Sequence, residues 1–312
     1  MKVLIVANRN RGQFAPFVAE QAQALALEGI EVTWFGVTGH GIVGYLRNLP
    51  RLMLTIRREH PDLVHAHYGL CGLLACLQRR VPVVTTYHGS DINTSRIRRL
   101  CRLALRRSKC NIFVSEPLKA LAGDSFNPCV IPCGVDLDAF PPVGRDEARR
   151  QLGLDPAKHY VLFASAFDNS VKNAPLAQRA MQQVPQAELL ELKGYTRQEV
   201  ALLLRAVDCL LMTSTHEGSP QVVKEALACG TPIVSVPVGD VPRLIEQVEG
   251  CHIAHPDPDD IAAKLLQAIA FEGYTQGRDR ITLLGLNNKL IAQHLTTIYA
   301  KITRSKRSML PR

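Results

Sequence analysis

The sequence predicts an α/β protein of two domains, each with a parallel sheet wrapped by helices. The chain has 312 residues, enough for two domains that each bury a core of their own. Strand-sized apolar runs alternate with helical periodicity along nearly its whole length, the pattern typical of a parallel sheet with helices on both faces. The alternation is interrupted by "FPPVG" at 140–144, which we interpret as the domain boundary.

The first half begins with the strand "KVLIVA", a polar loop containing Gly12, and a helix that stops at Gly29. Further strands are expected in "PDLVHAHYG", "VPVVTTYHG", "KCNIFVSE" and "NPCVIPCG". Ligands of such sheets bind at the carboxyl ends of the strands. We therefore expect functional side chains in the loops that start at Asn8, His65, His88 and Pro132.

The second half resumes the alternation. Its strands are expected in "YVLFASAF", "AELLELKG", "DCLLMTS", "TPIVSVP" and "GCHIAH", with helices between them and a long amphipathic helix near the C-terminus. Two similar domains of this kind would leave a cleft between their strand ends.

Composition excludes several classes of protein. The longest apolar runs are strand-sized, far short of a membrane span, and Met1-Lys2 leads directly into one of them, so we expect a cytoplasmic protein without a signal peptide. Nine cysteines are scattered without a C-x-x-C pair, which favours reduced, buried thiols over a zinc site or a disulfide framework.

Charge is concentrated in the first half. Residues 1–140 hold 17 Lys/Arg against 10 Asp/Glu, a surplus of 7 out of the net +9. The segment "SRIRRLCRLALRRSKC" at 95–110 carries seven basic residues, no acid and an apolar stripe. A basic amphipathic helix suits an anionic membrane surface, and the alternative is a solvated helix face that packs on its own sheet. Nucleic acid is not expected, because no reading motif accompanies the charge. The membrane interpretation rests on Arg96, Arg98, Arg99, Arg102, Arg106 and Arg107.

The most informative segment is "HEGSPQVVKEALACG" at 216–230. It follows a strand, and Ser219-Pro220 predict a helix start with a hydroxyl cap and proline in the first turn. The free N–H groups near Gln221 and Val222 would then form an anion site at the strand ends. Carboxylates beside it, Glu217 and Glu225, are suited to accept hydrogen bonds from sugar hydroxyls. The alternative is that both are ordinary solvated acids.

With its neighbours, this segment resembles the signature of the retaining glycosyltransferases of family 4. The match includes two glutamates separated by seven residues, with Gly218 and Pro220 between them, and continues through "EALACGTPIVSVPVGDVPRLI". Similar stretches are "TTYHGSD", "IPCGVDLDAF" and "LIAQHLTTIY", in the expected order. The resemblance implies the GT-B fold, with an acceptor-side domain over 1–142, a shortened nucleotide-sugar domain over 143–283, and a final helix over about 284–302 that packs back on the first domain.

The resemblance also implies roles for individual residues. Glu217 would contact the donor sugar, Glu225 the ribose, and the N–H groups of Gln221 and Val222 the distal phosphate. His88 would lie near the reacting sugar, so His88 and Glu217 are the catalytic candidates. Gly12 would bring backbone close to donor or acceptor, and Asp91 is equally explained as a turn or helix cap. The full set of donor-binding candidates is Lys172, Leu192, Gly194, Tyr195, Gly218, Ser219, Gln221, Val222 and Glu225.

The sequence departs from the family at the diphosphate site. The family supplies an arginine and a lysine after the first strand of the second domain, whereas "FASAFDNSVKNAPL" offers only Lys172. Helix dipoles could suffice with Lys172, or Arg9 or Arg11 of the first domain could contribute. No carboxylate cluster indicates a metal, and no cofactor is expected besides the nucleotide-sugar donor.

The function implied is transfer of a sugar from a nucleotide diphosphate sugar to an acceptor hydroxyl, with a glycan or lipid-linked sugar as acceptor. A non-catalytic sugar-nucleotide-binding subunit and a GT-B epimerase are the alternatives. The sequence identifies neither the sugar, the base, the acceptor nor the oligomeric state.

Overall fold

A computed structural model describes residues 1–10 and 12–308 of the chain. The chain divides into two compact units. Unit 1 comprises Met1–Gly134 and the chain from Asn288 onward, and unit 2 comprises Val135–Asn287. Each unit contains one parallel sheet flanked by helices, so the expected α/β class with parallel sheets is confirmed.

The sheet of unit 1 has six strands in the order β2-β1-β3-β4-β5-β6. All neighbouring strands run parallel. The central strands β3 and β4 are buried at every position, as expected for strands covered on both faces. The strands are β1 (Lys2–Asn8), β2 (Glu31–Val37), β3 (Leu63–His67), β4 (Val83–Tyr87), β5 (Cys110–Phe113) and β6 (Pro128–Val130).

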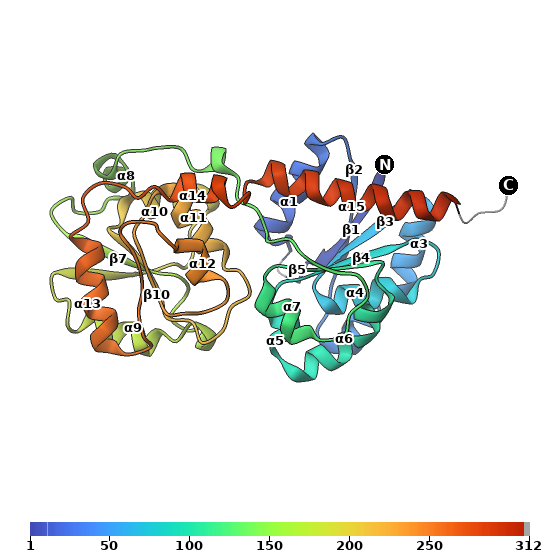
Figure 1. The fold of residues 1–312 in the computed structure, drawn as a ribbon, viewed down its shortest axis with the longest axis horizontal. Coiled ribbons are helices and arrows are strands. Elements are labelled where there is room, and N and C mark those ends of the chain that lie inside the picture. The colour runs from blue at the N-terminus through green and yellow to red at the C-terminus, as the bar shows by residue number, and fades with distance from the viewer. Residues whose placement is uncertain (11, 309–312) are drawn as a thin grey trace. The chain divides into compact units, whose positions relative to one another are not determined.

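Helices cover both faces of this sheet. The C-terminal helix lies along α1, where Ile291, Leu295 and Tyr299 join an apolar cluster with β1 and β5 (Figure 1). The helices of unit 1 are α1 (Pro16–Leu27), α2 (Gly41–Leu46), α3 (Leu49–Glu59), α4 (Gly69–Leu77), α5 (Ser90–Asn93), α6 (Ser95–Arg107), α7 (Glu116–Ala122) and α15 (Asn288–Ser308).

Helix α6 is the basic amphipathic segment expected from the sequence. Its apolar stripe is used inside unit 1, where Cys101, Ala104 and Leu105 are buried against α4 and the sheet. The close approach of α4 depends on Gly69, because a Cβ there would lie 2.3 Å from the Cys101 sulfur. These three positions of the stripe are therefore core, and the exposed arginines of α6 remain for an external partner.

The sheet of unit 2 has five parallel strands in the order β11-β10-β9-β7-β8. The strands are β7 (His159–Phe163), β8 (Ala187–Glu191), β9 (Cys209–Met212), β10 (Ile233–Ser235) and β11 (Cys251–Ile253). Its helices are α8 (Arg145–Leu152), α9 (Ala174–Met181), α10 (Arg197–Ala206), α11 (Gln221–Cys229), α12 (Val241–Ile245), α13 (Pro258–Ile269) and α14 (Gly277–Leu283). Two short 3-10 helices, η1 (Leu137–Ala139) and η2 (Ser170–Lys172), complete it.

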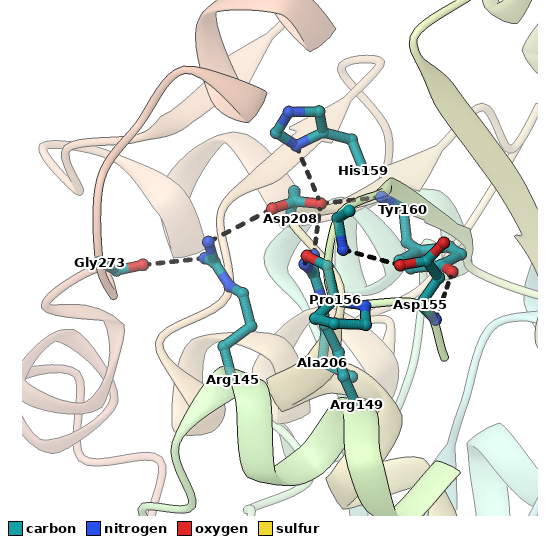
Figure 2. Close-up of polar contacts among 10 residues, drawn as sticks. Arg145, Arg149, Asp155, Pro156, His159, Tyr160, Ala206, Asp208 and Gly273 are labelled. Atoms are coloured by element: carbon teal, nitrogen blue, oxygen red, sulfur yellow. Dashed lines mark hydrogen bonds and ion pairs between the residues drawn. The ribbon is translucent and has the colours of Figure 1, made fainter. Parts of the chain in front are cut away.

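A buried carboxylate fastens the amino ends of strands β7 and β9. Asp208 is 3% exposed and accepts hydrogen bonds from the Tyr160 N–H at 2.8 Å and from Arg149 Nη2 at 2.9 Å (Figure 2). Arg145 lies 3.3 Å from its other oxygen. Since a buried carboxylate is tolerated only when it is paired and hydrogen-bonded, this cluster has a structural role. It lies at the strand edge opposite to the loops that carry the candidate site.

All nine cysteines are free thiols. Seven of them are buried and two, Cys129 and Cys251, are partly buried. The Cys110 and Cys129 sulfurs lie 3.4 Å apart on neighbouring strands, within a weak hydrogen bond.

Candidate functional site

Three adjacent strands of unit 2 deliver most of the predicted donor-site residues to one edge of the sheet. The loops that follow β7, β8 and β9 contain Lys172, Leu192–Tyr195 and Glu217–Pro220 respectively. The β7 and β9 loops are joined, because the Thr215 N–H donates to the Val171 carbonyl at 2.9 Å and the Thr213 hydroxyl donates to the Lys172 carbonyl at 2.9 Å. The strand ends therefore bring together residues that lie far apart in the sequence.

Lys172 and Glu217 form an ion pair. The Lys172 Nζ lies 2.6 Å from Glu217 Oε1, and the two side chains are 19% and 15% exposed. Their partial exposure leaves both groups accessible to a ligand. The Lys172 ammonium could bind an anionic ligand, and the Glu217 carboxylate could accept hydrogen bonds from hydroxyl groups.

The start of α11 differs by one residue from the sequence-based prediction. The helix begins at Gln221, Pro220 is the capping residue, and no side chain caps it, so the predicted hydroxyl cap of Ser219 is wrong. The Ser219 hydroxyl instead donates to Asp240 Oδ2 at 2.7 Å. This contact is possible because Gly239, which has no side chain, lets the loop that contains Gly218 come close to the loop before α12. A Cβ on Gly239 would lie 2.9 Å from the Gly218 carbonyl oxygen. The N-terminus of α11 has no side-chain cap, and such a helix end suits an anionic ligand.

Glu225 lies one turn into α11 and is 6% exposed. Its Oε1 is 2.5 Å from Nη1 of Arg197, the first residue of α10. The guanidinium of Arg197 also lies over the Phe140 ring, 4.8 Å from its centroid. Arg197 thus supplies the ion-pair partner that a nearly buried carboxylate requires.

The loop after β8 carries the remaining donor-site candidates. Leu192 is partly buried in the core of unit 2, Gly194 has a φ of +83°, and Tyr195 is 39% exposed. The Leu192 N–H donates to the Ser165 carbonyl at 3.1 Å, which ties this loop to the one after β7.

His88 and Gly12 lie in unit 1, in the loops after β4 and β1. The His88 ring contacts three aromatic rings: Phe17, His67 and Tyr68 have centroids 4.9, 5.3 and 4.7 Å away. His88 Nε2 lies 3.1 Å from Nδ1 of His67, a residue 1% exposed, and burial lowers the pKa of His67 to about 3. A neutral imidazole therefore orients His88.

Asp91 has a definite structural role. It is 3% exposed, and its carboxylate accepts hydrogen bonds from the N–H groups of Gly69 at 2.9 Å, Gly89 at 3.0 Å and His88 at 3.2 Å. Burial raises the pKa of the Asp91 carboxyl, and the backbone N–H groups oppose that rise. The Asp91 carboxylate therefore ties the His88 loop to the first residue of α4.

A cavity of about 630 Å³ opens at the carboxyl ends of the unit 1 strands. It lies beside Tyr68, the residue that contacts the His88 ring. Amides, hydroxyls and aromatic rings form most of its wall, including those of Asn8, Asn10, Gln13, Phe14, Tyr68 and Ser90. Its size and mixed polar and aromatic lining are those of a small-molecule site.

Sequence reasoning did not single out three charged residues of unit 2, namely Arg197, Lys224 and Asp240. Arg197 follows a strand-end loop and could have been considered there, but its partner Glu225 is 28 residues away. Lys224 is fully buried. Burial raises the pKa of the Asp240 carboxyl, and the positive charge of Lys224 opposes that rise. Burial of a lysine in the exposed-looking sequence "QVVKE" is visible only in the fold.

Other predicted groups do not join these clusters. Arg9 donates through Nε to the Gly12 carbonyl, and Arg11 lies outside the described residues. Within residues 1–10 and 12–308, no group of three or more His, Cys, Asp or Glu could hold a metal ion. Over the same residues, no helix is both long and apolar enough to span a bilayer.

Comparison with known proteins matches both units to glycosyltransferase families. Residues 5–139 match Glycosyltransferase Family 4, and residues 170–270 match Glycosyl transferases group 1. A D-inositol 3-phosphate glycosyltransferase of Pseudarthrobacter chlorophenolicus is 26% identical over 73% of this chain and 75% of its own. A Bacillus subtilis glycosyltransferase assigned to teichuronic acid biosynthesis is 27% identical over 60% of this chain and 56% of its own. For most of the first relatives, the match spans less than two thirds of the relative's length.

Solved structures share the fold. A sucrose-phosphate synthase from Thermosynechococcus elongatus superposes with a TM-score of 0.84 at 18% identity, over 98% of this chain and all of the other. Anabaena HepE in complex with UDP superposes with a TM-score of 0.74 at 17% identity, over 96% of this chain and all of the other. The motif, the two parallel sheets and the matches to both halves agree, and the chain belongs to glycosyltransferase family 4 with the GT-B fold.

Proposed function

We propose that this protein transfers a glycosyl group from a nucleotide diphosphate sugar to an acceptor hydroxyl, with retention at the anomeric carbon. The observation that supports it most is the pairing of both signature glutamates with cations at one strand edge, Glu217 with Lys172 and Glu225 with Arg197. This arrangement offers carboxylates to hydroxyl groups and positive charge to a diphosphate within one site.

Each donor group has a natural partner in this proposal. The diphosphate binds at the uncapped N-terminus of α11, near the N–H groups of Gln221 and Val222, and beside Lys172. The ribose binds at Glu225, and the sugar at Glu217. The base lies against the loop Leu192–Tyr195, where Tyr195 offers an exposed ring.

Catalysis then depends on positioning and on stabilising the departing diphosphate. The bond between the anomeric carbon and the diphosphate oxygen breaks as the acceptor oxygen bonds to that carbon, and the acceptor proton passes to the departing diphosphate. Lys172 and the α11 N-terminus stabilise the negative charge that develops on the leaving diphosphate. His88 is the candidate from unit 1 for contact with the reacting sugar.

A donor panel tests this function. Purified protein is incubated with UDP-, GDP- and ADP-sugars, and release of the nucleoside diphosphate is measured with and without glycan acceptors. UDP-glucose comes first, because structures of the similar HepE hold UDP and UDP-glucose. Acceptor-dependent release supports transfer. Nucleotide binding without turnover across the panel would favour a non-catalytic subunit, and a changed sugar recovered on the nucleotide would favour an epimerase.

Contact with an anionic membrane surface is a second part of the proposal. Four arginines of α6, namely Arg98, Arg99, Arg102 and Arg106, line a cavity of about 460 Å³ whose only acidic neighbour is Asp124. Because the apolar stripe of α6 is buried, the attraction would be electrostatic, roughly 1 kcal/mol per basic residue near the surface. A lipid-linked glycan would then be presented at the same surface.

Liposome flotation tests this contact. Arg102→Gln/Arg106→Gln should reduce binding to vesicles that contain phosphatidylglycerol, whereas Arg150→Gln/Arg179→Gln, which removes the same charge from exposed helices of unit 2, should not. Equal binding to neutral and anionic vesicles would contradict the proposal.

A further inference from the structure

We infer that the cavity at the strand ends of unit 1 binds an uncharged sugar, and that its built-in carboxylate excludes phosphorylated acceptors. The inference rests on the proposed function and specifies the chemical class of the acceptor. It also separates this chain from relatives named for a phosphorylated acceptor, D-inositol 3-phosphate.

The chemistry of the cavity wall is the first observation. Among the described residues that line it there is no lysine or arginine, and the only acidic side chain is that of Asp91. A phosphate in a protein site is normally held by charged donors or by a free helix N-terminus. The described part of this wall supplies no cation for that purpose.

The helix ends around the cavity are the second observation. Gly69 is the first residue of α4, and its N–H is occupied by the Asp91 carboxylate at 2.9 Å. The same carboxylate occupies the N–H groups of His88 and Gly89. The N-terminus of α4, nine residues long, is therefore already neutralised by a carboxylate of the chain itself.

Helix α1 also begins at the cavity wall, and it offers little to an anion. Its first residue is Pro16, which has no N–H. The N–H groups of Val18 and Ala19 both donate to the Ala15 carbonyl, at 3.0 and 3.2 Å. These two N–H groups of the first turn are therefore already bonded to the chain's own backbone.

Two described arginines that flank wall residues in the sequence are directed elsewhere. Arg9 donates to the Gly12 carbonyl at 2.9 Å, and its side chain lies against Gly36 and the Phe14 ring. Arg98 of α6 donates to the Leu121 carbonyl at 3.1 Å, on the side of the arginine-lined cavity. Neither guanidinium lines the cavity.

Hydroxyl-bearing ligands, in contrast, find suitable partners. The side chains of Gln13, His40, Tyr68 and Ser90 make no hydrogen bond to other described residues, so their donors and acceptors are available. The aromatic faces of Phe14 and Tyr68 provide apolar area beside them. Neutral hydrogen-bonding groups combined with aromatic rings match the surface of a sugar ring.

Trp34 provides a direct probe of this cavity. It is the only tryptophan of the chain, and its ring stacks on that of Phe14, with centroids 4.4 Å apart. Trp34 fluorescence is titrated with matched pairs that differ only by a phosphate: glucose and glucose 6-phosphate, galactose and galactose 6-phosphate, and myo-inositol and its monophosphate, together with neutral oligosaccharides. We expect saturable changes with neutral ligands and at least about tenfold weaker binding of each phosphorylated partner.

Two variants sharpen the measurement. Gln13→Ala should weaken binding of the neutral sugars several-fold, whereas Gln23→Ala, an exposed residue of α1 remote from the cavity wall, should leave it unchanged. Ser90→Arg places a cation at the wall. It should reduce the difference in affinity between each neutral ligand and its phosphorylated partner.

The outcomes decide between the inference and the proposed function. Equal or tighter binding of the phosphorylated sugars by the unmodified protein overturns the inference, and so does the lack of a saturable response to any neutral sugar. Nucleoside diphosphate binding is measured in parallel by calorimetry. If nucleotides bind and these results occur, only the inference fails; if neutral sugars bind but no nucleotide does, the proposed function fails instead.

Discussion

The ammonium of Lys172 lies 2.6 Å from the Glu217 carboxylate, although the two residues are 45 positions apart in the chain. The pair is formed across the loops that follow β7 and β9, which are hydrogen-bonded to one another. A site built this way already holds its charged groups in place before a ligand arrives, which lowers the cost of organising them during the reaction.

Loss of either member of this pair should abolish transfer. We expect Lys172→Ala and Glu217→Gln each to reduce kcat/KM by about 100-fold or more, because each removes a charged contact to the donor. Steady-state rates and urea unfolding separate a catalytic defect from misfolding. Lys158→Ala is the matched control, since Lys158 pairs with Glu188 at 3.4 Å on the exposed surface. Normal turnover in either site variant would remove that residue from the site.

The Arg197–Glu225 pair should determine how strongly and how selectively the ribose of the nucleotide is bound. Without Arg197, the nearly buried carboxylate of Glu225 loses its cation and its fixed orientation. We expect Arg197→Ala to weaken nucleoside diphosphate binding about tenfold and to reduce the preference for ribonucleotides over 2′-deoxynucleotides. Calorimetric titration with both nucleotide series measures this. Arg179→Ala, an exposed arginine on α9, should change neither quantity, and an unaltered ribose preference in Arg197→Ala would contradict the proposed role.

Two buried histidines should make unit 1 sensitive to acid. Burial lowers the pKa of His67 to about 3, and burial also lowers the pKa of His65 well below its usual value. Both stay neutral in the native state, while the unfolded chain takes up their protons below about pH 6.5, so stability falls as the pH is lowered from that value towards 3. Between pH 7.5 and 5 each histidine should cost about 2 kcal/mol of unfolding free energy.

Urea unfolding followed by Trp34 fluorescence at several pH values measures this dependence in unit 1. We expect His67→Gln to remove roughly half of the pH dependence assigned to the two histidines, whatever its stability at pH 7.5. His294→Gln, an exposed histidine on α15, should leave it intact. An unchanged slope in His67→Gln would show that His67 is protonated in the folded protein.

Asp208 should affect stability and leave the donor site unchanged. Asp208→Asn removes the charge that balances Arg149, which is 5% exposed, and should destabilise unit 2 by about 2–4 kcal/mol. Because Asp208 lies at the amino ends of β7 and β9, nucleotide affinity below the unfolding transition should be unchanged. Asp155→Asn, at an exposed position, should shift stability by no more than about 0.5 kcal/mol. A selective loss of nucleotide affinity in Asp208→Asn would refute the structural role.

The pattern of strands and helices could be predicted from the sequence because it depends on local chemistry. The apolar run "VLIVA" indicates a strand, and Gly230, which has a φ of +70°, marks the end of a helix. Both signals depend on neighbouring residues only. Local patterns were weaker guides where a distant group competed. The Ser219 hydroxyl bonds to Asp240, 21 residues away, and the apolar stripe of α6 packs within unit 1.

The sequence by itself determined that this is a two-domain α/β protein with the two glutamates of the family signature, because strand periodicity, helix stops and motif spacing are properties of neighbouring residues. The tertiary structure alone decided the partner of each glutamate and the charge of the unit 1 cavity. Lys172 and Arg197 reach their carboxylates across 45 and 28 residues, and Asp91 neutralises a helix that begins 22 residues before it. Such contacts form only when parallel strands bring separate loops to one edge of a sheet, so the electrostatics of both sites follow from the strand order.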